Sequence, residues 1–253
     1  MERRRFSLLS SCRRGFLIKK EKYINMERHT IINALIKHYN FKSYLEIGLN
    51  NPFDNFTKII CENKESVDPY FDVEDLSFSN RKADRLSTKE LNTTLKLIPK
   101  YLTYRMTSDE FFEQNNKKYD IIFIDGLHTK EQVSKDIVNS LKILNHGGKI
   151  IVHDCLPPTE EHQIVPRIPN CGWCGDVWKA IPEFIKQGLD INVVNCDFGC
   201  AVISYCEHPE RIEIPSNFEH TWLDLNYCGG NLMHIISPEV FLLLLLIDKR
   251  DEI

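Results

Sequence analysis

The sequence predicts an α/β fold in which a mostly parallel, seven-stranded sheet is flanked by helices. Short apolar segments of strand length alternate along the chain with segments of helical periodicity, as in parallel sheets whose strands are joined by helices. The clearest strand, residues 119–125 (YDIIFID), is an apolar run of the kind that such a sheet buries on both faces. Several predicted strands end at Gly or an acidic residue, at the edge where ligands bind in these folds.

The N-terminal half supplies three of the expected strands. Apolar residues recur at helical spacing within residues 27–39 and predict the first helix. Residues 43–48 predict a buried strand that ends in a Gly turn, and Pro69 stops a second strand that begins at residue 65. The remaining expected elements are a helix over 53–62, one helix within 71–100 and a third strand over 101–106.

The C-terminal half continues the alternation after strand 119–125. Residues 129–144 predict an amphipathic helix, and Gly147 and Gly148 predict a turn into a fifth strand over 149–154. The sheet is completed by a strand pair, which follows a further helix; these elements are expected over 176–185 (helix), 191–195 and 200–205 (strands).

Composition and cysteine usage bound the class of protein. The chain has 253 residues, of which 42% are hydrophobic and 27% charged. These fractions fit a soluble globular protein and argue against a disordered, collagen-like or coiled-coil chain. Nine cysteines cannot all pair with one another, and they are too sparse for a small disulfide scaffold. We therefore expect mostly free thiols in a reducing, cytoplasmic location.

The charge is unevenly distributed. Residues 1–25 carry eight Lys or Arg residues and two Glu residues, a net charge of +6, so the total of −4 leaves −10 for the rest of the chain. We interpret residues 1–25 as a basic, disordered extension or a misassigned start, with a transit peptide as an open alternative. Residues 26–253 are then the functional domain. Its acidic charge predicts no nucleic-acid partner.

The longest apolar run is Val240–Ile247, near the C-terminal end of the sequence. It is far shorter than the roughly 20 residues that a spanning helix needs, so we expect no membrane partner. Ser237 and Pro238 precede it and resemble an N-cap with Pro in the first turn. The run therefore predicts a buried or interface helix, which makes a homodimer a reasonable expectation.

Acidic residues, Gly and His gather at the predicted strand ends. The residues concerned are Glu46, Gly48, Asp68, Ser108, Asp109, Asp125, His153 and Asp154. Gly48 permits a close backbone approach to a bound group, and Asp68, which ends the next strand, can accept both hydroxyls of a ribose. Together they indicate a nucleoside-type cofactor. The full G-x-G-x-x-G pattern of nicotinamide and flavin sites is absent from this turn.

Four segments, taken in order, carry a family resemblance. They are YLEIG at 44–48, VDP at 67–69, YDIIFIDGLH at 119–128 and GGKIIVHDC at 147–155. Over roughly residues 27–205 the sequence resembles a class I S-adenosylmethionine-dependent methyltransferase. It is most similar to the small-molecule O-methyltransferase branch, which is related to catechol and sugar O-methyltransferases. The resemblance implies a Rossmann-like methyltransferase fold and S-adenosylmethionine as the cofactor.

The resemblance also implies roles for individual residues. Glu46 and Gly48 would line the methionine end of the cofactor. Asp68 would bind the ribose, and Ser108 and Asp109 would sit at the adenine. Asp125, which ends the fourth strand, would lie beside the sulfonium.

A divalent metal ion is possible but not fixed by the resemblance. In metal-dependent members, the acid that ends the fourth strand and an acid pair after the fifth hold the ion. Asp125 and Asp154 match two of these positions, whereas His153 replaces the first acid of the pair. Mg²⁺ prefers oxygen ligands, while His suits softer ions.

The alternative to a metal is a catalytic histidine. Neutral His near pH 7 suits the removal of the acceptor's proton, so His128 or His153 could be the general base, with Asp125 beside them. His128 stands where metal-dependent relatives place a Lys base; its other interpretation is a polar residue near a helix start. Residues 155–178 are the expected acceptor loop.

The sequence as a whole predicts a methyltransferase that methylates a small hydroxylated acceptor, with a sugar or glycan precursor as the favoured class. An RNA or protein methyltransferase and an inactive fold used as a binding module remain as alternatives. Within the loop, Trp173 and Trp178 could stack on a ring, although Trp178 also fits a core position. The binding module would need a zinc ion on four thiolates, whereas free buried thiols are the simpler interpretation. Those thiols belong to Cys171, Cys174, Cys196 and Cys200.

Overall fold

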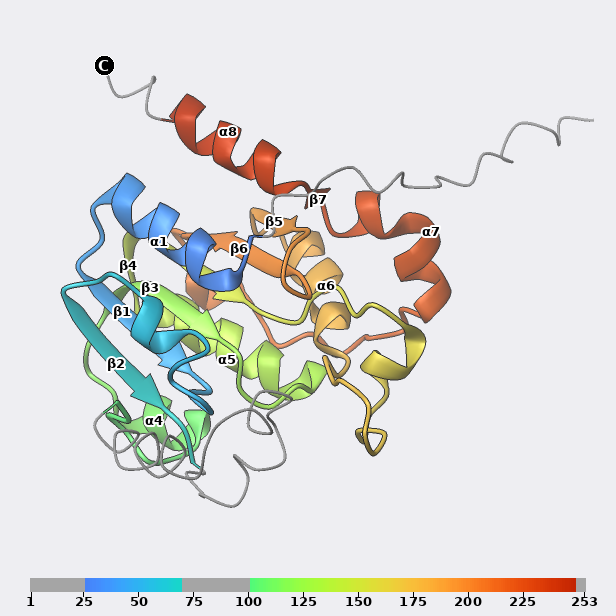
Figure 1. The fold of residues 1–253 in the computed structure, drawn as a ribbon, viewed down its shortest axis with the longest axis horizontal. Helices are drawn as coiled ribbons and strands as arrows, with labels where there is room; N and C mark the ends of the chain where they lie inside the picture. The colour runs from blue at the N-terminus through green and yellow to red at the C-terminus, as the bar shows by residue number, and fades with distance from the viewer. Residues whose placement is uncertain (1–25, 70–100, 249–253) are drawn as a thin grey trace, which may run out of the picture.

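The computed structural model describes residues 26–69 and 101–248 of the chain (Figure 1). A single sheet runs through this part of the molecule and is covered by helices on both faces. The extension expected over 1–25 and the helix expected within 71–100 lie outside the described residues.

Within the described ranges the sheet has seven strands, in the order β2-β1-β3-β4-β6-β5-β7. The strands are β1 (Ser43–Ile47), β2 (Asn63–Val67), β3 (Tyr119–Ile124), β4 (Leu144–Val152), β5 (Ile191–Val194), β6 (Cys200–Ser204) and β7 (Ile235–Ile236). Strand β6 runs antiparallel to both of its neighbours, and the other four pairings are parallel. The predicted α/β, Rossmann-like methyltransferase fold with a mostly parallel sheet is thus confirmed.

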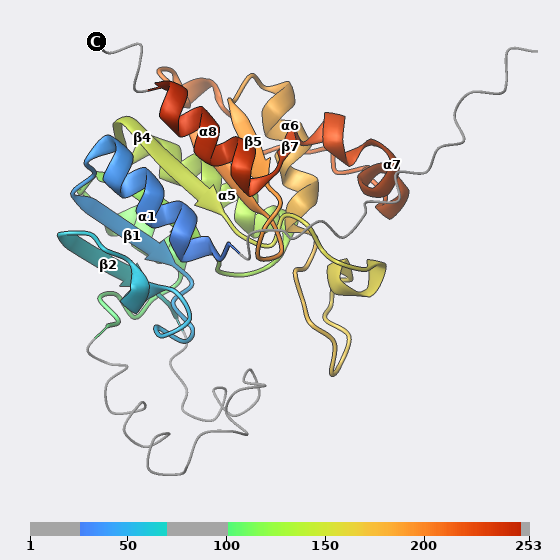
Figure 2. The same ribbon diagram turned by 45° about the horizontal axis from the view of Figure 1, so that its top comes forward.

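Helices pack on both sides of the sheet. They are α1 (Arg28–Tyr39), α4 (Ser108–Gln114), α5 (Lys130–Lys142), α6 (Ala180–Lys186), α7 (Trp222–Leu232) and α8 (Pro238–Asp248), with short 3-10 turns η1 (Phe56–Lys58), η4 (Glu160–Gln163), η5 (Val177–Lys179) and η6 (Pro209–Arg211). Figure 2 shows α1 and α8 on one face, with α5 and α6 on the other. No helix within the described ranges is long and apolar enough to cross a membrane.

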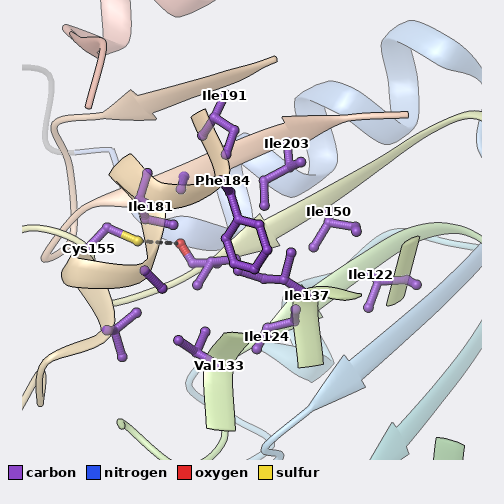
Figure 3. Packing of buried hydrophobic residues seen from close by; sticks show 14 of the residues in the cluster. Ile122, Ile124, Val133, Ile137, Ile150, Cys155, Ile181, Phe184, Ile191 and Ile203 are labelled. Carbon is purple, nitrogen blue, oxygen red and sulfur yellow. Dashed lines mark hydrogen bonds between the residues drawn. The ribbon is translucent and has the colours of Figure 1, made fainter. Parts of the chain in front are cut away.

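Successive residues of the central strand β3 face opposite layers of the core. Ile122 and Ile124 pack in the cluster that includes α5 and α6, whereas Ile121 and Phe123 pack in the cluster that includes α1 and α8. Figure 3 shows the first of these clusters, in which Phe184 of α6 packs among the strand side chains. Burial on both faces is why this strand reads as an apolar run in the sequence.

The prediction of a helix over 53–62 is wrong. This segment forms a series of turns and the short η1 helix, and its Asn55 has a non-helical backbone with φ −135°. The Asn55 amide instead donates a hydrogen bond of 3.0 Å to the buried carboxyl of Glu46. A tertiary contact has therefore overridden the local helical pattern.

The strand expected over 101–106 is also wrong, because only Tyr104 forms a single bridge there, to Val67. Side-chain oxygens take the place of neighbouring backbone partners. The Ser66 backbone N–H donates to the Thr103 hydroxyl at 3.1 Å, and the Thr103 backbone N–H donates to the Ser66 hydroxyl at 3.2 Å. The seventh strand of the sheet is instead β7, which the sequence pattern did not indicate.

Two further predicted element boundaries differ from those in the structure. The amphipathic helix ends at Lys142, and β4 begins at Leu144 and contains Gly147 and Gly148 instead of following them. The helix expected over 176–185 divides into η5 and α6. The predicted C-terminal helix is confirmed as α8, with Pro238 in its first turn.

Candidate cofactor and acceptor site

A cavity of about 230 Å³ opens at the carboxyl ends of β1, β3 and β4. Six of the predicted site residues line it: Glu46, Gly48, Asp125, His128, His153 and Asp154. The rest of the lining comprises Arg28, Leu49, Asn50, Asn51, Asp54, Asn55, Trp173 and Phe198. The parallel strands therefore bring residues that are far apart in sequence to one place, as expected from their positions at strand ends.

Gly48 is required by the close approach of two strand ends. Its φ is +88°, and a Cβ added there would lie 2.1 Å from the backbone oxygen of Asp125. The Gly48 N–H donates to the Val67 carbonyl at 2.9 Å, and the Asp125 N–H donates to the Ile47 carbonyl at 2.8 Å. These bonds hold the chain where any side chain would collide with backbone.

We expect Gly48→Ala to lower the free energy of unfolding by about 2–4 kcal/mol, because it combines backbone strain with a backbone collision. Gly188→Ala is the matched control, since Gly188 has a similar φ of +91° but open space around the missing Cβ. Urea unfolding of both variants measures the difference. Equal losses in the two variants would show that the close approach at Gly48 is not tight.

Glu46 is a buried carboxyl at the cavity wall, 1% exposed. It accepts hydrogen bonds from the Tyr44 hydroxyl at 2.5 Å and the Asn55 amide at 3.0 Å. Burial raises the pKa of Glu46 to about 8, and the hydrogen bond from Tyr44 only partly opposes this rise. The carboxyl is therefore protonated at neutral pH until a positive group comes near it.

Asp68 directly follows the last residue of β2 and is 8% exposed. Its carboxylate accepts the backbone N–H of Asn50 at 2.8 Å, which ties the loop after β1 to the neighbouring strand. Asp68 is not part of the cavity lining. Its role at a ribose stays a prediction.

Ser108 and Asp109 begin helix α4 beside its capping residue Thr107. The Gln132 amide donates to the Ser108 hydroxyl at 3.2 Å and to the Asp109 carboxylate at 3.0 Å. Lys135 lies 3.4 Å from the other Asp109 oxygen. The structure thus turns both residues toward α5 and does not bring them into the cavity lining, and their adenine role stays a prediction.

Asp125 is the centre of a charged network. Its Oδ2 lies 2.7 Å from the guanidinium of Arg28, and its Oδ1 lies 3.3 Å from His153 and 3.4 Å from His128. Burial alone would raise the pKa of the Asp125 carboxyl, but the neighbouring His153, His128 and Arg28 hold it well below its usual range. Asp125 is therefore ionised over the whole physiological range.

Both predicted catalytic histidines face carboxylates. Nδ1 of His128 lies 3.0 Å from the Trp173 carbonyl and 3.1 Å from Asp154, and Nδ1 of His153 lies 3.3 Å from Asp154. Burial alone would lower the pKa of each imidazole, but the carboxylates Asp125 and Asp154 raise both above the ordinary value. The imidazolium form lacks the free nitrogen that a general base needs, so the base role stays a prediction.

Two members of the network were missed by sequence reasoning. Arg28, the first residue of α1, also places Nε 3.0 Å and its backbone N–H 3.1 Å from the Asp197 carboxylate. Asp197 lies between β5 and β6, so the strand-end rule could have singled it out. A cation at a helix N-terminus opposes the helix dipole, and this signal in the sequence could have pointed to Arg28.

The acidic cluster has the spacing of metal ligands but not the charge environment. Among the described residues, the group whose ligand atoms lie within 4.8 Å of one another is Asp125, His128 and Asp154, so His128 takes the place predicted for His153. However, the Asp125 Oδ2 is already held by Arg28 at 2.7 Å. A divalent cation would meet that fixed positive charge, so the residues as arranged do not fit a metal ion.

The acceptor loop divides its tryptophans between two roles. Trp173 lines the cavity and stacks on His128, with ring centroids 5.1 Å apart. Trp178 is fully buried in the core, and its indole N–H donates to Gln163 at 2.7 Å. Among the described residues, no group with metal-ligand geometry contains the four thiols considered for zinc: Cys171, Cys174, Cys196 and Cys200.

Comparison with known families decides the class. Residues 50–155 match the family model described as a methyltransferase domain. This stretch of the chain is similar to methyltransferase domains. The matched segment begins in the loop after β1 and contains strands β2, β3 and β4, in agreement with the predicted methyltransferase class.

Solved structures similar to this methyltransferase domain include three from different organisms. A candidate caffeoyl-CoA O-methyltransferase from Staphylococcus aureus is 22% identical over 72% of this chain and 85% of its own, with a TM-score of 0.46. A methyltransferase from Podospora anserina, bound to the demethylated cofactor product S-adenosylhomocysteine (SAH), is 14% identical over 72% of this chain and 81% of its own, with a TM-score of 0.48. An O-methyltransferase from Bacillus cereus in complex with SAH is 14% identical, over 70% and 80%, with a TM-score of 0.42. A search of the curated proteins finds no significant match.

Proposed function

We propose that this methyltransferase transfers the methyl group of S-adenosylmethionine to a hydroxyl oxygen of a small molecule, with a sugar or glycan precursor as the acceptor class. The observation that supports this most directly is the cavity at the ends of β1, β3 and β4. There, the Cβ-free backbone of Gly48 lies beside the buried carboxyl of Glu46. The first lines the cavity with backbone alone, and the second would receive the ammonium group of the cofactor.

S-adenosylmethionine supplies a methyl group already activated by its sulfonium, so the chain's own residues need only bind, orient and balance charge. The walls of the cavity align the acceptor oxygen with the methyl carbon, which removes orientational entropy from the reaction. As the C–O bond forms and the C–S bond breaks, the cofactor becomes its neutral thioether product. The acceptor's proton passes to His128 or His153 in the neutral imidazole form, the predicted general bases. Arg28 places a permanent positive charge at the cavity wall, near the oxygen that becomes negative.

The favoured acceptor class agrees with the chemistry of the cavity wall. Asn50, Asn51 and Asp54 offer side-chain amide and carboxylate groups that can bond to several hydroxyls. Trp173 and Phe198 offer ring faces beside them. Hydroxyl-rich small molecules with one apolar face match this mixture.

The direct test is transfer of labelled methyl from S-adenosylmethionine to a panel of sugars, sugar nucleotides and phenols. We expect product only with small hydroxylated acceptors, with the methyl on oxygen. Labelling of RNA or of protein with no labelling of any small acceptor would replace this proposal. Recovery of the methyl on nitrogen or carbon would contradict the reaction type.

We expect Asp68→Asn to lower the affinity for the cofactor by about 100-fold, because a ribose would lose bonds to a charged acceptor. Calorimetry with the full chain and the demethylated product SAH measures the change. Glu62→Gln, on the exposed surface, is the control. Unchanged affinity in the Asp68 variant would remove this residue from the site.

No observation on the described residues favours the alternatives. The thiols considered for a zinc-stapled binding module are not gathered around a metal position there. The basic residues 1–25, on which an RNA substrate would depend, lie outside the described residues. The cytoplasmic location stays a prediction.

Helix α8 supports the expected homodimer. It packs Phe241 into the core, whereas Leu243 and Leu246 remain 55% and 62% exposed. We expect a second copy to cover this face, so that Leu243→Glu combined with Leu246→Glu converts a dimer to a monomer in light scattering. Val240 and Ile247 extend the same exposed apolar surface. A wild-type protein that is monomeric at high concentration would contradict the dimer.

A further inference from the structure

We propose that Arg28 takes the position of a divalent cation in this site. The acidic cluster is then balanced by the chain's own guanidinium, and methyl transfer needs no metal ion. Arg28 is a positioning residue, because it fixes the carboxylates around the cavity. The metal-binding part of this inference stands on geometry alone, while its consequence for activity rests on the proposed function.

The guanidinium bridges two carboxylates from distant parts of the sequence. Nη1 lies 2.7 Å from Asp125 at the end of β3, and Nε lies 3.0 Å from Asp197 between β5 and β6. The backbone N–H of Arg28 also donates to Asp197 at 3.1 Å. Two carboxylates thus hold three nitrogen atoms of one residue. These contacts fix the position of the guanidinium as well as balancing its charge.

The guanidinium holds a carboxylate that a metal ion would need. Nη1 of Arg28 is bonded to Oδ2 of Asp125, a member of the group with ligand spacing, and lies 3.3 Å from Nδ1 of His153. The other oxygen of Asp125 faces His153 and His128. Both oxygens therefore already face positive or proton-bearing groups, and none is left for a metal to bind without displacing one of them.

Charge balance leads to the same conclusion. The carboxylates of Asp125, Asp154 and Asp197 surround one permanent cation, Arg28, and the imidazoles of His128 and His153. A divalent ion added to this set would lie a few ångströms from the guanidinium, and repulsion between such charges at partly buried sites is strong. The Arg28 side chain is 21% exposed, so water screens only part of it.

The test is a titration of the full chain with Mn²⁺, followed by calorimetry and by the magnetic resonance signal of the free ion. We expect no stoichiometric binding to the wild type. Arg28→Gln should bind one Mn²⁺ per chain at least about 100-fold more tightly, because removal of the guanidinium frees Asp125. Arg28→Lys keeps the charge and should not gain this affinity. Arg105→Gln makes the same charge change on an exposed residue and is the matched control.

Two results of the Mn²⁺ titration would overturn the inference. One Mn²⁺ bound to the wild type and lost in Asp125→Asn would overturn the inference, whether or not Arg28→Gln folds. Failure of a folded Arg28→Gln variant, checked by its thermal transition, to gain affinity would overturn it as well. In the activity assay, we expect chelator to leave wild-type turnover unchanged. Absence of all turnover would count against the proposed function and would leave the Mn²⁺ result to decide this inference.

Discussion

The Asp125→Asn variant is expected to lose nearly all methyl transfer and about 2–4 kcal/mol of unfolding free energy. Removal of this carboxylate leaves the Arg28 guanidinium and the imidazoles of His128 and His153 around a neutral amide. Breaking a buried ion pair from one side costs several kcal/mol, and the 16% exposure of the Asp125 side chain lowers this cost because water screens part of it. The loss should show in urea unfolding at pH 7.

The effect should depend on pH with a defined sign. The folded-state pKa of Asp125 lies below its unfolded value, so its contribution is complete above the unfolded pKa and is lost as pH falls through the folded one. The stability gap between wild type and Asp125→Asn should therefore narrow in acid. Asp54→Asn, at the exposed rim of the same cavity, is the control. A gap that widens below pH 4 would contradict this account of Asp125.

The second large effect is expected at Glu46, where substitution should have opposite consequences for stability and binding. Burial raises the folded-state pKa of this carboxyl from 4.5 to about 8, which corresponds to on the order of 5 kcal/mol. Because the folded state favours the protonated form, the wild type loses stability as pH rises from about 4.5 to about 8. Glu46→Gln keeps the neutral shape and should remove this slope.

The affinity for the cofactor should also depend on Glu46. A carboxylate can pair with the ammonium of S-adenosylmethionine, whereas the amide of Glu46→Gln cannot, so we expect affinity to fall by about 10- to 100-fold. Unfolding curves between pH 5 and pH 9 and calorimetry with the cofactor measure the two effects. Glu62→Gln on the surface should alter neither. A variant that binds normally but loses stability would contradict the role of Glu46.

Much of the site could be predicted because strand periodicity is local. Glu46, Asp125 and His153 each lie at or beside the end of a strand whose apolar pattern is clear. Parallel strands bring such ends to one edge, so the residues meet without any knowledge of tertiary contacts. The same argument placed Gly48, and the structure adds its reason in the collision with the Asp125 backbone.

The remainder could not be predicted because it depends on contacts between distant parts of the chain. Arg28 and Asp125 are 97 residues apart, and Arg28 and Asp197 are 169 apart. The expected strand over 101–106 failed because side-chain hydroxyls of Ser66 and Thr103 replaced backbone pairing, which no periodicity records. The local sequence pattern thus identified the edge of the sheet where the site lies. It did not identify Arg28, the cation that balances the carboxylates there.

Whether the cavity binds a methyl donor can be measured by calorimetric titration of the full wild-type chain with S-adenosylmethionine. We expect one cofactor bound per chain, with binding lost or greatly weakened in Asp68→Asn and Glu46→Gln. The product SAH should compete for the same site. Absence of binding to a folded wild type at high cofactor concentration would contradict the claim that this cavity is a methyltransferase site.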